Sequence, residues 1–137
     1  MKGQSSLELL VTVGIVVAFT IPVLFLLLSA TSIGYDDTAK AQADASSRSL
    51  SDTMNSVYSQ GPGAKRVILL NVPSSTEEIY SSGGEVVVRI RTGSGEFEAA
   101  SPTIAQVAGG SQTLEEKTGL FMLTVQTNDQ GEVELIE

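Results

Sequence analysis

The chain has 137 residues, a net charge of −8, and neither cysteine nor histidine. Its acidic balance argues against nucleic acid as a partner, because phosphate binding depends on clustered Lys and Arg. Without cysteine there is no disulfide, thiolate metal site or thiol nucleophile, and without histidine the usual general base is missing. The composition weighs against an enzyme, and we expect no catalytic residue, no metal ligand and no cofactor.

The chain opens on a short polar segment, Met1-Lys2-Gly3-Gln4-Ser5-Ser6-Leu7-Glu8, which runs directly into an apolar one. Ser5 stands three residues before Glu8, which is the spacing of a helix capping box. One interpretation is therefore that Ser5 caps a helix while Glu8 bonds back to its start and gains from the helix dipole.

An uncharged apolar run follows, from Leu9 to Ala30, with the sequence LLVTVGIVVAFTIPVLFLLLSA. At about 1.5 Å of rise per residue, a helix of this length covers the roughly 30 Å hydrocarbon core of a bilayer. Pro22 is tolerated in such a helix, since neighbouring groups in lipid can satisfy the freed carbonyl. Hydroxyls in the run can bond back to carbonyls of the same helix; they belong to Thr12, Thr20 and Ser29.

An ordinary secretory signal peptide is the alternative interpretation of the same run. Lys2 would be its basic start, and Leu28-Ser29-Ala30 a rough cleavage site. The run is longer than the roughly 7–15 apolar residues of such a signal. An acid, Glu8, also stands at its edge, which disfavours the alternative.

The order of Gln4, Ser6 and Glu8 directly before an apolar run resembles the class III signal peptide of archaeal type IV pilin-like proteins. That family has the pattern Q-x-S-x-E, and usually a Leu four positions after the Glu, where this chain has Thr12. The resemblance implies that a prepilin peptidase cuts between Gly3 and Gln4 on the cytoplasmic side. The hydrophobic helix would stay attached, and Glu8 would be the fifth residue of the mature protein.

The resemblance gives Glu8 a role in assembly, which physical chemistry supports. An acid that enters an apolar environment must find a cation or stay at the headgroups. Cleavage before Gln4 would create a new amine within reach of a neighbouring subunit's Glu8. Such a pair could fix the axial register of subunits in a filament.

Helical periodicity continues beyond the apolar run. Apolar residues recur at helical spacing at Ala39, Ala43, Leu50, Met54 and Val57, with charged residues elsewhere on the wheel. We therefore expect one helix from about Ser5 to Gln60, loosened near Gly34. Gly61-Pro62-Gly63 ends it.

Strand patterns take over after residue 61. Runs with strand character are Lys65–Val72, Glu85–Arg91, Leu120–Gln126 and Glu132–Ile136, with further short strands predicted at Glu77–Ser81, Glu96–Ala99 and Thr103–Val107. Glycine-rich turns separate them. This pattern favours an antiparallel sandwich or small barrel, with helix residues Leu50, Met54, Val57 and Tyr58 covering one side.

The predicted head offers no chemistry. The adjacent acids Glu77-Glu78 and Glu115-Glu116 would point in different directions on a strand and are more typical of a solvated edge than of a metal site. Thr92-Gly93-Ser94-Gly95 reads as a hairpin turn, since no helix follows it to hold a phosphate. Arg89 and Arg91 share a strand face, and we expect them to pair with Glu132 or Glu134.

Three parts are therefore predicted: a leader (1–3), a long helix (4–60, apolar at 9–30) and a β-rich head (61–137), giving an α+β fold. The expected function is that of a structural subunit of an archaeal type IV pilus-like surface filament. Its partners would be further copies of itself, a prepilin peptidase, the membrane before assembly and a possible adhesion target, but not nucleic acid. The alternative is a singly anchored surface binding module, or a minor or archaellum-associated pilin-like protein.

Overall fold

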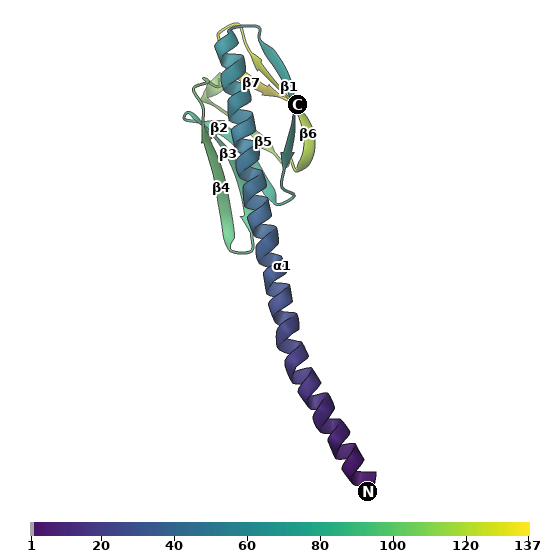
Figure 1. Cartoon of the computed structure of the whole chain (residues 1–137). Helices are drawn as coiled ribbons and strands as arrows, with labels where there is room; N and C mark the ends of the chain where they lie inside the picture. The colour runs from purple at the N-terminus through teal and green to yellow at the C-terminus, as the bar shows by residue number, and fades with distance from the viewer. Residues whose placement is uncertain (1) are drawn as a thin grey trace. The chain divides into compact units, whose positions relative to one another are not determined.

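The computed structural model describes residues 2–137. It has an α+β fold, with one long helix followed by two antiparallel sheets (Figure 1), as the sequence predicts. Helix α1 spans Lys2–Gln60 and passes without interruption through Pro22 and Gly34, so the loosening expected near Gly34 is not found. The helix ends at Gly61, whose φ of 88° lies in the left-handed region that glycine adopts without strain.

Seven strands and one short 3-10 helix follow the long helix. They are β1 (Lys65–Val72), β2 (Thr76–Ser82), β3 (Glu85–Thr92), β4 (Gly95–Pro102), η1 (Ala108–Gly110), β5 (Ser111–Glu115), β6 (Gly119–Thr127) and β7 (Val133–Ile136). The strand order is β1-β6-β7 in one sheet and β4-β3-β2-β5 in the other. All strand pairings within the two sheets are antiparallel.

The chain divides into two compact units, one ending at Tyr35 and the other spanning Asp36–Glu137. We call the second unit the head. Because the boundary falls inside α1, the last part of the helix belongs to the head and is not a linker in front of it. The sequence placed the start of the head at residue 61, so the compact unit begins earlier than the change of secondary structure.

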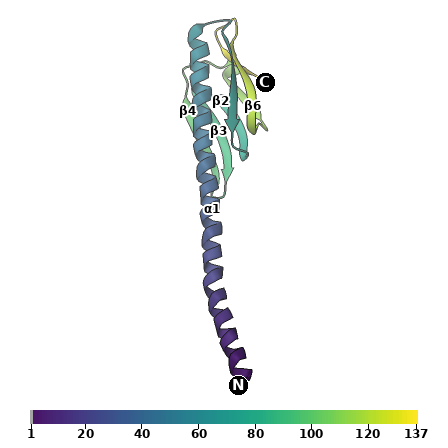
Figure 2. The same ribbon diagram turned by 45° about the vertical axis from the view of Figure 1, so that its right-hand side comes forward.

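One hydrophobic core joins the two sheets and the head's share of α1. Its fully buried large side chains are Leu50, Met54, Val57, Leu70, Val72, Ile79, Val86, Val88, Ile90, Leu123, Val125 and Val133. Tyr58 packs against this cluster from the helix, and Phe121 and Leu135 do so from the first sheet. The prediction that the helix covers one side of the sheets is therefore confirmed (Figures 1 and 2).

The head's share of α1 also covers two open sheet edges. β1 is the edge of one sheet and β4 the edge of the other. On the β1 side, Ser46 Oγ donates a hydrogen bond to the carbonyl of Asn71 at 2.5 Å. Backbone groups at uncovered edges invite pairing with other chains, and this helix blocks part of both edges.

The β4 side is held by three residues of α1 spaced four apart, Ser47, Ser51 and Asn55, which we call the polar stripe. Ser47 Oγ shares a 2.8 Å hydrogen bond with Ser101 Oγ, and Ser51 Oγ donates to the carbonyl of Pro102. Asn55 Oδ1 accepts two hydrogen bonds from the segment just after β4: one from the hydroxyl of Thr103, the other from the amide of Ile104. No buried side-chain nitrogen or oxygen among the described side chains lacks a hydrogen-bond partner. Burying the polar stripe therefore leaves no polar atom without a hydrogen bond, and the desolvation cost of such an atom does not arise.

Two strand predictions were wrong. Thr103–Val107 is not a strand, because the amides of Thr103 and Ile104 bond to Gly84 and Asn55, and only Val107 makes an isolated bridge, to Val133. Conversely, β5 (Ser111–Glu115) was missed, since its sequence SQTLE has a single apolar residue, Leu114. Pairing with β2 makes it a strand, which is a tertiary effect that overrides weak local preference.

Candidate functional site

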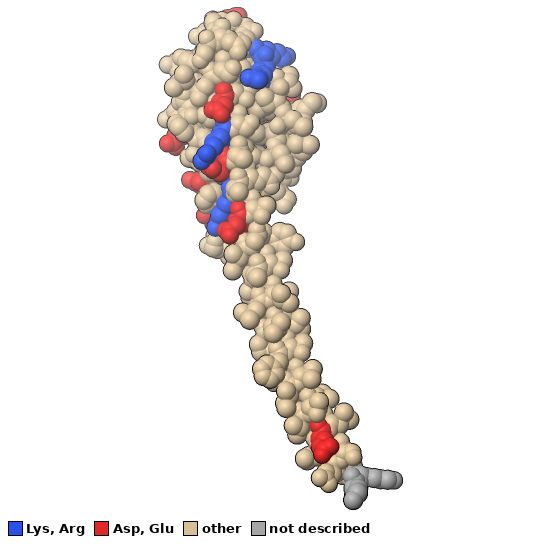
Figure 3. Space-filling view, in the orientation of Figure 1, with Lys and Arg blue, Asp and Glu red and all other residues tan. Residues whose placement is uncertain are grey.

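The candidate site is the first unit, the part of α1 that carries the leader motif and the apolar run. Every residue from Gly3 to Tyr35 is exposed in the isolated chain. The helix contains a window with a mean hydropathy of 2.7, long and apolar enough to cross a membrane. Residues 9–35 contain no Asp, Glu, Lys or Arg, and Figure 3 shows a long part of the helix surface without red or blue side chains. A contiguous apolar surface of this length is compatible with membrane association.

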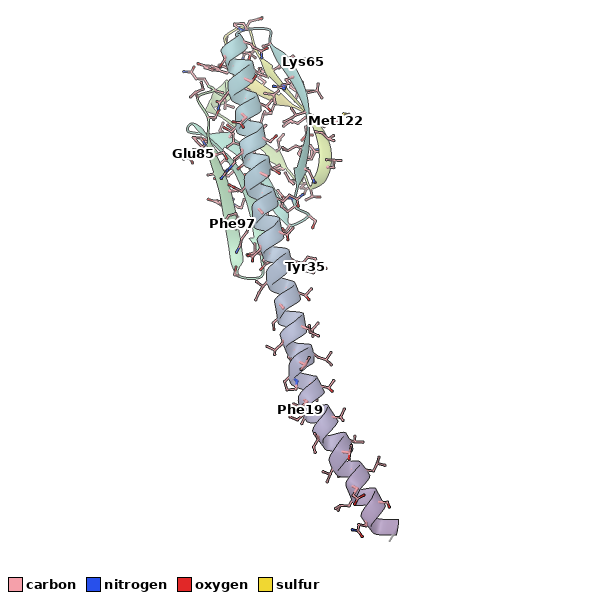
Figure 4. All side chains as sticks on the ribbon, viewed as in Figure 1. Phe19, Tyr35, Lys65, Glu85, Phe97 and Met122 are labelled. Atoms are coloured by element: carbon pink, nitrogen blue, oxygen red, sulfur yellow. The ribbon has the colours of Figure 1, made fainter. Side chains whose placement is uncertain are left out.

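The energetics of the run favour lipid. Fifteen of its 22 residues are Leu, Ile, Val or Phe. Each of these contributes about −0.3 to −0.6 kcal/mol near the centre of a membrane helix, so together they favour insertion by several kcal/mol. Phe19, near the middle of the run, is 73% exposed and points away from the helix axis (Figure 4).

The polar groups in the run are satisfied within the helix, as predicted. The hydroxyl of Thr12 donates to the Glu8 carbonyl at 2.8 Å, that of Thr20 to the Val16 carbonyl at 2.7 Å, and that of Ser29 to the Phe25 carbonyl at 2.9 Å. Such back-bonding removes most of the cost of a hydroxyl in hydrocarbon. Thr12, the position at which the chain departs from the pilin pattern, is therefore compatible with a lipid environment.

The residues of the predicted cleavage site and leader motif lie on the first turns of this helix. Gly3, Gln4, Ser6 and Glu8 are all helical and exposed. Gln4 and Glu8 are four residues apart and share one helix face. A Cβ added at Gly3 would have no atom within 4 Å, so the chain itself places no steric demand for glycine there.

The capping-box interpretation is not supported. Ser5 lies inside α1, which already includes Lys2, so its backbone is helical and it does not form the N-cap. Glu8 is therefore not occupied in closing the helix start. Its side chain is exposed.

The junction between the two units is fixed on the head side by contacts that sequence reasoning missed. The carboxylate of Asp36 accepts the amide of Gly93 in the β3–β4 turn, with distances of 3.0 and 3.2 Å to its two oxygens. A Cβ at Gly93 would lie 3.1 Å from Asp36 Oδ2, so the carboxylate would have to move by a few tenths of an ångström to admit a side chain there. One turn further along the helix, Lys40 Nζ lies 5.8 Å from the ring centroid of Phe97 on β4. The sequence contains one signal for the contact of Asp36, because Asp36 is the first acid after a long uncharged stretch.

The charged residues of the second sheet form a surface network. Arg89 bonds to Glu78 and to Glu98, each at 2.8 Å, and lies 5.5 Å from the ring centroid of Tyr80. The hydrogen bond that Arg89 donates to Glu98, followed by the charges of Glu98 and Glu78, raises the pKa of Arg89 above its ordinary value. The guanidinium therefore stays charged at every relevant pH.

The predicted partners of the two arginines were wrong. Arg91 pairs with Glu77 at 2.6 Å, and neither arginine pairs with Glu132 or Glu134. The reason is topological, because β3 lies in one sheet and β7 in the other. Glu77 and Glu78 are thus used in ion pairs, and no group of acids among the described residues is arranged to hold a metal ion.

Comparisons of this chain with protein-family models, with curated proteins and with solved structures give no match.

Proposed function

We propose that this chain is a structural subunit of a type IV pilus-like cell-surface filament of the archaeal kind. A prepilin peptidase removes residues 1–3, and the subunit waits in the membrane on the apolar part of α1. It then polymerises through that same helix, with the head forming the outer wall of the filament.

The proposal rests on one observation about α1. The first part of this helix is apolar and uncovered, and the last part of the same helix is built into the folded head. Residues 9–30 are exposed, yet α1 continues without a break to Gln60, where its side chains belong to the core. An ordinary signal peptide is discarded and has no need of such continuity. A subunit that exchanges lipid for neighbouring helices does need it, because the same surface must serve in both environments.

Glu8 sets the register in this proposal. It is exposed, it stands at the start of the apolar run, and Ser5 does not hold it in a cap. In a helix bundle it pairs with the amine of Gln4 that cleavage creates on a neighbouring subunit. Removing one member of a buried charge pair costs about 3–5 kcal/mol, because the other charge is left without compensation.

The test compares wild type, Glu8→Ala and a control, Ser5→Ala, at equal amounts of membrane protein. Mass spectrometry of the mature chain reports whether cleavage occurs before Gln4. Microscopy and quantitation of sheared surface material report filaments. We expect Glu8→Ala to be cleaved and inserted but not assembled, and Ser5→Ala to assemble. Normal filaments from Glu8→Ala would reject the register role, and a cleavage elsewhere would reject the pilin proposal.

A further inference from the structure

The two sheets of the head present opposite kinds of outer surface. The outer face of β4-β3-β2-β5 carries the ion pairs of Arg89 and Arg91 described above. The outer face of β1-β6-β7 carries an apolar patch. Six large apolar side chains are exposed after Tyr35, namely Val67, Leu69, Ile104, Leu120, Met122 and Ile136. All but Ile104 lie on this face, which we call the apolar face.

The strand register shows that these side chains are neighbours. Leu69 stands opposite Met122, and Asn71 opposite Leu120. Thr124, on the central strand, has Val67 as its partner on β1 and Ile136 on β7. Cross-strand partners point to the same side of a sheet, so the five form one patch. Met122 is 70% exposed and points outward from the sheet (Figure 4).

One row of this face carries charges of opposite sign. Gln126 on β6 has Lys65 as its partner on β1 and Glu134 as its partner on β7. The row therefore runs from a cation at one edge of the sheet to an anion at the other. When a second copy of this face is rotated by 180° about an axis along the middle strand and laid on the first, the cation of each copy meets the anion of the other.

We propose that the apolar face binds the same face of a second copy, about a two-fold axis parallel to the strands that passes beside β6. This operation lays Lys65 of each copy against Glu134 of its partner and Val67 against Ile136, with Thr124 near the axis. The contact is isologous, so each pair occurs twice. The row of Lys65, Gln126 and Glu134 fixes how the two faces are aligned, and the apolar patch supplies most of the buried area.

The direction of the chains selects this axis. α1 residues 42–53 and β1 run antiparallel side by side, since Gln42 and Ser46 line one groove with Asn71 while Asp52 and Thr53 line another with Arg66. An axis along the strands keeps the strands and the head helices of both copies pointing the same way. Because α1 continues from the apolar run into the head without a break, this axis suits two chains anchored in one membrane. An axis across the strands would reverse one copy and place Lys65 against Asn71.

The size of the face predicts where pairing occurs. β1 has 8 residues, and with strands about 4.8 Å apart and about 3.3 Å of rise per residue the face covers roughly 400 Å² per copy. The total of roughly 800 Å² is below the roughly 1,200–2,000 Å² of stable complexes. Pairing should therefore be weak in dilute solution and strong when both copies are held in one membrane, where the effective concentration reaches about the mM range. The expectation of strong pairing in one membrane rests on the membrane anchor of the proposed function, but not on the filament.

Cross-linking tests the proposal cleanly, because the chain has no cysteine. Full-length Thr124→Cys is placed in membranes of a host that makes no filament and treated with a short bis-maleimide. Stacked sheets lie about 10 Å apart, beyond the reach of a disulfide but within that of this reagent. Gln126→Cys is a second probe on the central strand. Ala100→Cys, exposed on the outer face of the other sheet, is the matched control.

We expect Thr124→Cys and Gln126→Cys to give a dimer band at least several-fold stronger than Ala100→Cys. Adding Leu69→Glu should abolish it, whereas Ile104→Glu, outside the face, should not. Lys65→Glu should weaken the band, and the exchange Lys65→Glu with Glu134→Lys should restore it. Protease resistance of the head verifies folding of each variant.

Three results would overturn the proposal. Equal cross-linking at Ala100→Cys would mean random collision. Labelling of Thr124→Cys by a bulky maleimide without cross-linking would mean an open face. Protection from labelling without cross-linking would mean that lipid or another protein covers the face. None of these results bears on filament assembly, and loss of filaments in the Glu8 experiment does not bear on them.

Discussion

The replacement Leu50→Ala tests whether the second part of α1 is a structural member of the head. Leu50 is 0% exposed and lies in the core that the helix shares with both sheets. Truncating a buried leucine to alanine costs about 2–5 kcal/mol, from lost transfer energy and from the cavity left behind. The total stability of such domains is about 5–15 kcal/mol, so this loss is a large fraction of it.

The same helix provides a matched control, Leu26→Ala, in which the leucine is 71% exposed within the apolar run. Both variants are purified full length in one detergent, and the loss of the strand signal in circular dichroism is followed with temperature. For a unit of the head's size, about 4–8 °C of midpoint shift accompanies each kcal/mol. We expect Leu50→Ala to melt at least about 8 °C below wild type and Leu26→Ala to match wild type. Equal midpoints for the two variants would refute the assignment of Leu50 to the head's core.

Three further outcomes are expected. A bulky residue in place of Gly3, as in Gly3→Leu, should block leader removal by a peptidase that accepts only small residues before the cut, so an unchanged mature mass would contradict the leader assignment. A chain that begins at Ile33 should be soluble and show a mostly β spectrum with one helix, because the long apolar run at 9–30 is gone while the core cluster is intact; a disordered spectrum would count against the two-unit architecture. Asp36→Ala should speed hydrogen exchange at the Gly93 amide several-fold, with little change at the buried strand β3, since only the turn loses its carboxylate acceptor.

Local patterns predicted much of this fold because the relevant segments carry their own signals. The run KRVILLNV is apolar and ends at Pro73, and β1 has the predicted bounds. Gly61-Pro62-Gly63 cannot continue a helix, and α1 ends there. Four of the five residues of β5 are not apolar, so nothing local marks it as a strand, and it exists because β2 offers it a partner.

The partners of side chains were harder to predict than the elements. Arg89 and Arg91 were correctly placed on one strand face. Which acidic residues they pair with depends on which strands lie beside β3, and that is a property of the whole topology. The polar stripe was likewise missed. Serines at four-residue spacing beside the apolar positions of the helix were a usable signal, since residues at i and i+4 share a face. The leader residues Gly3, Gln4, Ser6 and Glu8 could be located in the helix, but their proposed roles depend on other molecules.

The bonds between α1 and the sheet edges have a consequence for how this protein can change over generations. The hydroxyls of Ser46 and Ser51 donate to main-chain carbonyls, at Asn71 on the β1 edge and at Pro102 on the β4 edge. A main-chain acceptor persists whichever side chain stands at its position. The exposed side chains along these edges can therefore change while the serine hydroxyls keep their hydrogen bonds to the main chain. The outer surface of the head can therefore change its side chains along these edges without loosening the helix that is built into it.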